Sequence, residues 1–72
     1  MSYFSEKLKD LRTQSGLTQD QFAKKIGVSQ SAVGMYETAE REPNFETLLK
    51  IASTLKVDPG ALLCKPKRGK DF

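Results

Sequence analysis

The stretch that decides the fold is "LTQDQFAKKIGVSQSAVGMYE", residues 17–37. It contains two short segments whose apolar residues recur at helical spacing, joined by only three residues, "GVS". Such a short connection cannot turn the chain into a relaxed antiparallel hairpin, so the two helices must cross at a steep angle. The stretch therefore predicts a helix-turn-helix formed by residues 19–26 and 30–38.

A repeated capping pattern marks the expected helix boundaries. Thr18 is a favourable N-cap with Gln21 as its capping-box partner, and the apolar residues Leu17 and Phe22 flank it as a hydrophobic staple. The same arrangement of a cap inside an apolar pair recurs twice: Ser29 with Val28 and Val33, and Asp58 with Val57 and Leu62. Asn44 is expected to cap a further helix, because asparagine is a preferred N-cap residue.

Apolar residues follow helical spacing along the whole chain, which predicts an all-α domain of five helices. The expected helices span residues 3–14, 19–26, 30–38, 45–55 and 59–63. Gly16 and Gly27 fall where helices should end in a left-handed residue. The large apolar side chains are expected in the core, namely Phe4, Phe22, Tyr36, Phe45 and the leucines. In "GALL", residues 60–63, Leu63 could either complete the core or remain exposed for dimerisation.

The composition excludes several classes of protein. The chain has 72 residues, one cysteine, Cys64, and no histidine, so it offers almost nothing from which to build a disulfide, a zinc site or a histidine-dependent catalytic centre. No apolar run approaches the roughly 18 residues of a membrane helix, and the N-terminus lacks the apolar stretch of a signal peptide. We expect a cytoplasmic protein that is not an enzyme, without metal, cofactor, membrane contact or small-molecule ligand.

The charge is unevenly distributed. Residues 1–35, 36–63 and 64–72 carry net charges of +2, −2 and +3, so the body of the domain is nearly neutral. Binding to nucleic acid would have to rely on a few placed contacts rather than on bulk attraction. We place the domain at residues 1–64 and a basic tail at 65–72. The tail is either a solvated, flexible terminus or a source of phosphate contacts, from Lys65, Lys67, Arg68 and Lys70.

At 100° per residue, the helix expected at 30–38 has an apolar side and a polar side, the latter an arc of about 140°. The apolar side comprises Ala32, Val33 and Tyr36, and the other comprises Gln30, Ser31, Gly34, Met35 and Thr38. The polar side has no charge, which is unusual for a solvated helix face. It suits the major groove of DNA, where glutamine and serine bond base edges and small or apolar groups meet a thymine methyl. A plain polar surface with a tolerated glycine is the alternative.

The segments "LTQDQFAKKIGVSQSAVGMYE" and "REPNFETLLKIASTLKVDPGALL" resemble the Cro and lambda-repressor type of helix-turn-helix proteins, over residues from about Phe4 to Leu63. The resemblance implies a compact five-helix DNA-binding domain from a bacterium or phage. It also implies a sequence-specific regulator of transcription, a repressor, that binds a palindromic site on double-stranded DNA as a homodimer.

The resemblance assigns roles to residues at matching positions. Gln30, Ser31 and Met35 match base-reading positions. Gly34, on the same side of the helix, would let it lie deep against base edges and is the fourth base-reading candidate. Gln19 matches a glutamine that bonds a phosphate and braces the base-reading glutamine. Arg41, Asn44 and Phe45 match further phosphate-contacting positions, with Arg41 flanked by two glutamates. Thr38 is an additional candidate for a phosphate contact.

Further positions have structural roles in the resemblance. Arg12 and Glu37 match a largely buried ion pair, and Pro59 and Leu63 lie at the C-terminal edge that forms the dimer. One residue departs from the family pattern: Ala39 stands where glycine is usual. Either Ala39 adopts a left-handed conformation or the helix before it runs on.

A protein-binding module is the second reading, in which an antitoxin of this fold neutralises a toxin and binds DNA secondarily. Such proteins usually carry an additional segment that covers the toxin, and the tail after residue 64 is short for that purpose. An enzyme is the third reading. It is disfavoured because no nucleophile, base and orienting group can be assembled from these residues.

Overall fold

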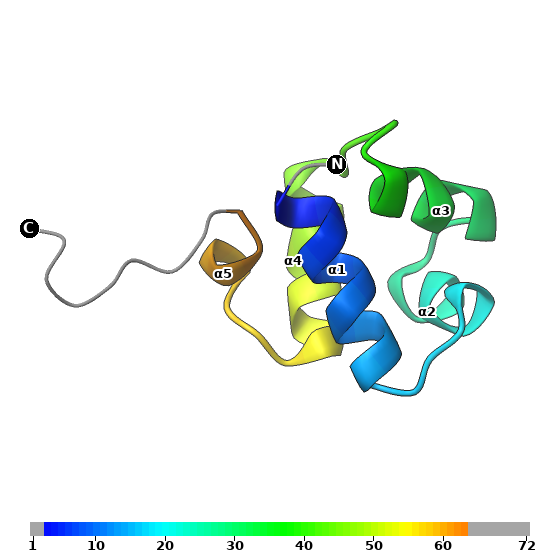
Figure 1. Cartoon of the computed structure of the whole chain (residues 1–72), viewed down its shortest axis with the longest axis horizontal. Coiled ribbons are helices and arrows are strands. Elements are labelled where there is room, and N and C mark those ends of the chain that lie inside the picture. The colour runs from blue at the N-terminus through cyan, green and yellow to red at the C-terminus, as the bar shows by residue number, and fades with distance from the viewer. Residues whose placement is uncertain (1–2, 64–72) are drawn as a thin grey trace, which may run out of the picture.

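The computed structural model describes residues 3–63 and contains five α-helices, with no β-strand in that part of the chain. They are α1 (Tyr3–Gln14), α2 (Gln19–Ile26), α3 (Gln30–Thr38), α4 (Phe45–Leu55) and α5 (Pro59–Leu63). These bounds confirm the five ranges expected from the sequence. Figure 1 shows α2 and α3 on one side of α1 and α5 on the other. Helix α3 packs against α1 and α2, whereas α5 packs against α1 and α4.

Side-chain caps begin the helices as expected. Thr18 and Gln21 form a reciprocal capping box, in which the Gln21 amide donates to Thr18 Oγ1 (3.1 Å) and the Thr18 amide to Gln21 Oε1 (3.0 Å). Three further caps accept from amides two or three residues ahead: Ser29 from Ala32, Asn44 from Thr47 and Asp58 from Gly60. Because these bonds are local, each helix start is encoded by its own short sequence.

The helix ends use left-handed residues, two of which are not glycine. Gly16 and Gly27 both have φ of 76°, as expected. Ala39 has φ of 67° and directly follows α3, so of the two alternatives the left-handed alanine is correct. Lys56 ends α4 in the same way with φ of 60°, at a position where the sequence carries no glycine or asparagine to signal it. Each left-handed non-glycine residue costs roughly 1–2 kcal/mol, which the surrounding packing must offset.

The core lies where α1, α2, α3, α4 and α5 meet. Its buried apolar residues are Leu8, Phe22, Ala23, Ile26, Ala32, Val33, Tyr36, Leu48, Ile51, Ala52, Leu55 and Leu62. Val33, on the inner side of α3, is completely buried. The staple residues Leu17, Val28 and Val57 are partly buried and pack against the same cluster, as do Phe4 and Leu11.

Three large apolar side chains lie outside this core. The expectation of burial was wrong for Phe45 and Leu49, whereas exposure was one of the two alternatives given for Leu63. Phe45 is 70% exposed, Leu49 41% and Leu63 59%. Phe45 and Leu49 are four residues apart and share an edge of α4. That edge is rotated away from the buried stripe that contains Leu48, so neither side chain joins the core cluster. Of the two leucines that end α5, Leu62 completes the core and Leu63 remains exposed.

Candidate nucleic-acid interface

The outer face of α3 is exposed, polar and uncharged. Gln30, Ser31 and Thr38 are exposed, and Gly34 and Met35 are half-buried along the same side of the helix. Ser29 caps α3 through the amide of Ala32, which places Gln30 and Ser31 in the first turn. Both can therefore reach outward without unmaking any hydrogen bond of the cap.

Gly27 lies at the turn that determines how α3 is oriented relative to α2. Its left-handed backbone ends α2, and its amide donates to the carbonyl of Ala23. Two residues later Ser29 starts α3, so the chain changes direction over three residues. Helix α2 then packs across the inner side of α3 through Phe22, Ala23 and Val33. The inner side of α3 is thus used for packing, and the outer side is not covered by α2.

The start of α2 lies against α3. The Gln19 amide nitrogen donates to Glu37 Oε1 (3.1 Å), and an added Cβ at Gly34 would stand 3.9 Å from that nitrogen. The resemblance implied instead that Gln19 braces Gln30. In the described part of the chain, the Gln30 side chain forms no hydrogen bond.

A buried ion pair joins α1 to α3. Arg12 Nε donates to Glu37 Oε2, and Arg12 Nη2 donates to Glu37 Oε1 at 3.3 Å. The third nitrogen, Nη1, donates to the carbonyl of Leu17 at 2.7 Å. Arg12 is 8% exposed and Glu37 3%. Because both charges are buried, each depends on the other to remain in the interior.

The residues between α3 and α4 form a second exposed edge. Thr38 donates its hydroxyl to the carbonyl of Met35 (3.2 Å). Arg41 is exposed and, within residues 3–63, makes no ion pair despite its glutamate neighbours. Asn44 and Phe45 are exposed at the start of α4, with Asn44 capping the amide of Thr47 (2.8 Å). The first amides of a helix attract anions, so this edge is the candidate for phosphate contacts.

The C-terminal edge presents a small apolar hollow. It encloses about 210 Å³ and is lined by Tyr3, Phe4, Glu42, Pro43, Leu48 and Leu63. Of the two candidates for dimer contacts, Leu63 lines this hollow and Pro59 is half-buried at the start of α5. Cys64 and the tail residues Lys65, Lys67, Arg68 and Lys70 lie outside the described residues.

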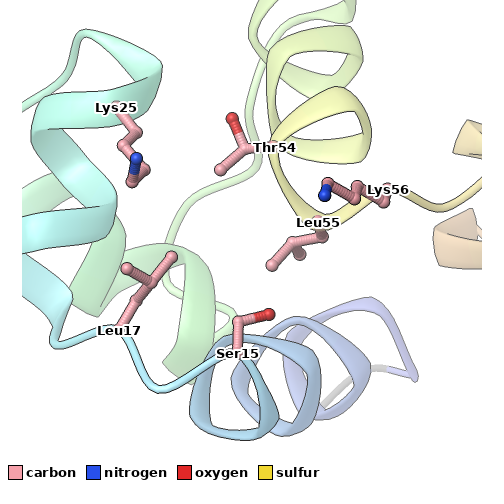
Figure 2. Close-up of a pocket in the computed structure, with 6 residues that line it drawn as sticks. All are labelled: Ser15, Leu17, Lys25, Thr54, Leu55 and Lys56. Carbon is pink, nitrogen blue, oxygen red and sulfur yellow. The ribbon is translucent and has the colours of Figure 1, made fainter.

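A larger hollow, of about 590 Å³, lies at the C-terminal ends of α1, α2 and α4. Figure 2 shows Lys25 and Lys56 reaching toward it from opposite sides, above Leu17 and Leu55. Carbonyl groups at helix C-termini carry partial negative charge, which nearby lysines offset. These lysines therefore have a structural explanation, and the hollow lies at the opposite end of α4 from Asn44.

A helix-turn-helix with a free, uncharged outer face, set in a bundle of five helices, defines a DNA-binding domain of the Cro and lambda-repressor type. A family model described as "Helix-turn-helix" matches residues 8–62, and the chain belongs to this helix-turn-helix family, whose members are DNA-binding transcriptional regulators.

Individual relatives agree with this assignment. The chain is 43% identical over 60 residues to the HTH-type transcriptional regulator YqaE of Bacillus subtilis, and the match covers 83% of this chain and 52% of that protein. The chain spans about half the length of the curated relatives it matches.

Two of the solved structures that the chain resembles are matched over most of their own length. The P22 c2 repressor bound to a synthetic operator has a TM-score of 0.83 and 32% identity, over 88% of this chain and 96% of that one. The restriction-modification controller protein C.AhdI of Aeromonas hydrophila has a TM-score of 0.78 and 35% identity, over 83% and 91%.

Two further features bear on the site. None of the helices between residues 3 and 63 has the length and hydrophobicity to cross a membrane. The same residues contain no group of three or more cysteine or acidic side chains placed to hold a metal ion.

Proposed function

We propose that this chain is a sequence-specific regulator that binds double-stranded DNA with α3 in the major groove, and that it acts as a repressor. The observation that carries the proposal is the uncharged outer face of α3, with Gln30 and Ser31 exposed in its first turn. A glutamine can bond an adenine edge through two hydrogen bonds, and serine can bond donors or acceptors. Met35, further along the same face, offers an apolar contact for a thymine methyl.

The phosphate contacts would come from both sides of α3. Gln19 stands at the first residue of α2 and Phe45 at the first residue of α4, where main-chain amides lack partners within the helix. Arg41, free of ion pairs in the described residues, adds a positive charge between them. Such contacts fix the register of the protein on the duplex, whereas base contacts supply the sequence preference.

We further propose a homodimer on a palindromic operator. The support is apolar surface on α5 and α4, where Leu63 and Leu49 are exposed although both are large and hydrophobic. Burying them against a second copy removes this surface from water. A two-fold dimer would place its two α3 helices on half-sites about one helical turn, roughly 34 Å, apart.

The repressor assignment rests on relatives. The c2 protein of P22 is a repressor seen on an operator, and a second relative, RstR of Vibrio cholerae, is a phage transcriptional repressor 39% identical over 49 residues. Those functions belong to those proteins, and their shared helix-turn-helix supports the same role here.

Selection of bound duplexes from a random DNA pool tests the proposal. We expect an enriched palindrome, because a symmetric dimer presents the same α3 face to each half-site. A pool without enrichment would contradict sequence-specific binding. An enriched motif without two-fold symmetry would contradict the dimer alone.

A further inference from the structure

The Gln19 side chain is held by the buried ion pair of Arg12 and Glu37. This ion pair forms no part of the base-reading face of α3. Glu37 Oε1 accepts hydrogen bonds from Gln19 Nε2 (3.1 Å) and from Arg12 Nη2 (3.3 Å). The same arginine donates Nη1 to the carbonyl of Leu17, two residues before Gln19. The ion pair therefore holds the entrance to α2 at two points, through the backbone at Leu17 and the side chain at Gln19.

Gly34 leaves room beside α3 for the Gln19 side chain. A Cβ built at Gly34 would lie 3.9 Å from Gln19 Nε2 and 4.0 Å from its Oε1, which is ordinary van der Waals contact. The amide thus lies against α3 about one turn before Glu37. Alanine would fit at this position, whereas a longer side chain would compete for the space that the amide occupies.

The ion pair of Arg12 and Glu37 also sets the net charge beside the start of α2. A lone Glu37 carboxylate would repel a phosphate approaching the start of α2, but Arg12 balances its charge in the interior. Gln19 can therefore bond the carboxylate without adding net negative charge beside the phosphate site. Its amide nitrogen carries two protons, so one remains for another acceptor after the first is given to Glu37.

We propose that Arg12 and Glu37 are positioning residues for DNA binding, which orient the Gln19 amide so that its second N–H meets a DNA phosphate. The inference rests on the proposed function. Because Gln19 bonds Glu37 and not Gln30, the phosphate contact and the base-reading contact are set independently. Disturbing the Gln19 side chain should weaken binding to all duplexes alike and leave sequence preference unchanged.

Two double variants of the full chain separate this role from a purely structural one. The apolar variant combines Arg12→Met with Glu37→Leu, an exchange of a buried ion pair that often leaves stability unchanged or improved, and it removes the acceptor of Gln19. The amide variant combines Arg12→Met with Glu37→Gln, which also removes both charges but keeps an amide oxygen for Gln19. Thermal melting establishes that both variants are folded.

Affinity is then measured on the duplex enriched by selection and on a mixed-sequence duplex. We expect the apolar variant to bind about tenfold more weakly than the amide variant on both duplexes, the scale of one hydrogen bond to a charged group. Adding Gln19→Ala should reduce binding by the amide variant to the level of the apolar variant, and it should leave the apolar variant unchanged. Equal affinities of the two double variants, or a further loss when Gln19→Ala is added to the apolar variant, would overturn the positioning role.

Side-chain amide resonances of Gln19 give a readout without DNA. One of its two N–H protons should be shifted and protected in the parent and in the amide variant, and both should resemble free amide in the apolar variant. A Gln19 amide that is already free in the parent would overturn the proposal. A parent chain that binds neither duplex would instead overturn the proposed function, and the positioning role with it.

Discussion

Gln30 illustrates how much a single residue can decide at this interface. It is exposed in the first turn of α3, and within the described residues its side chain makes no hydrogen bond. Nothing inside the described part of the protein therefore competes for it when a base edge is offered.

Replacing Gln30 with alanine should reduce specificity and spare non-specific binding. We expect Gln30→Ala to cost about 1–3 kcal/mol per half-site on the selected duplex, because a two-bond contact to adenine is lost. Fluorescence anisotropy on the selected and mixed-sequence duplexes measures the difference. If the variant binds the selected duplex as tightly as the parent does, α3 is not the element that reads bases.

Ala39 and Lys56 are residues whose backbone conformation suits glycine better than their own side chains. Their φ angles are 67° and 60°. We expect Ala39→Gly and Lys56→Gly each to stabilise the domain by about 1 kcal/mol, because glycine adopts the left-handed region without penalty. Chemical denaturation measures the gain. Ser53→Gly, an exposed change inside α4, serves as the control and should destabilise, since glycine is a poorer helix former.

At the scale of the elements, the crossing of α2 and α3 depends on the side chains packed between them. Val33 is completely buried there, beside Phe22 and Ala23 in the core cluster. The angle of the helix-turn-helix is thus fixed by apolar packing as well as by the left-handed Gly27.

Val33 variants should distinguish the effect of a larger side chain on stability from the effect of a charged one, at the crossing of α2 and α3. Val33→Asp buries a charge without a partner and should unfold the domain, whereas Val33→Ile adds one methylene and should cost about 1–3 kcal/mol at most. Circular dichroism and thermal melting report both. A folded Val33→Asp protein would contradict the packing of α3 described above.

At the scale of the whole molecule, the candidate DNA interface and the candidate dimer contact at Leu63 lie on different helices. Helix α3 and the starts of α2 and α4 carry the candidate DNA interface, while α5 lies on the other side of α1 (Figure 1). A second copy bound at Leu63 would leave the outer face of α3 uncovered.

Leu63→Ser tests the dimer without disturbing the fold. The side chain is 59% exposed, so its loss should change the melting temperature little, while removal of apolar area should weaken self-association. Sedimentation equilibrium measures the association, and we expect binding to a full palindrome to fall more than binding to a single half-site. Gln14→Ser, an exposed change at the end of α1, is the control and should alter neither. Unchanged self-association of Leu63→Ser would place the dimer surface elsewhere.

The local sequence determined all five helix ranges. Each of the caps at Thr18, Ser29 and Asn44 bonds an amide only three residues ahead, so the signal and its effect lie within one turn. The spacing of apolar residues likewise placed Val33 and Tyr36 inside, because the side-chain direction along a helix follows from its period. These features need no knowledge of the rest of the chain.

Only the tertiary structure decided the remaining points. Phe45 is exposed because its edge of α4 is turned away from the core, and only the structure decided between the two alternatives at Ala39, where φ is 67°. The hydrogen bond between Gln19 and Glu37 joins residues 18 apart in sequence. Such a contact depends on the angle at which two helices cross, and that angle is a property of the assembled core rather than of either segment.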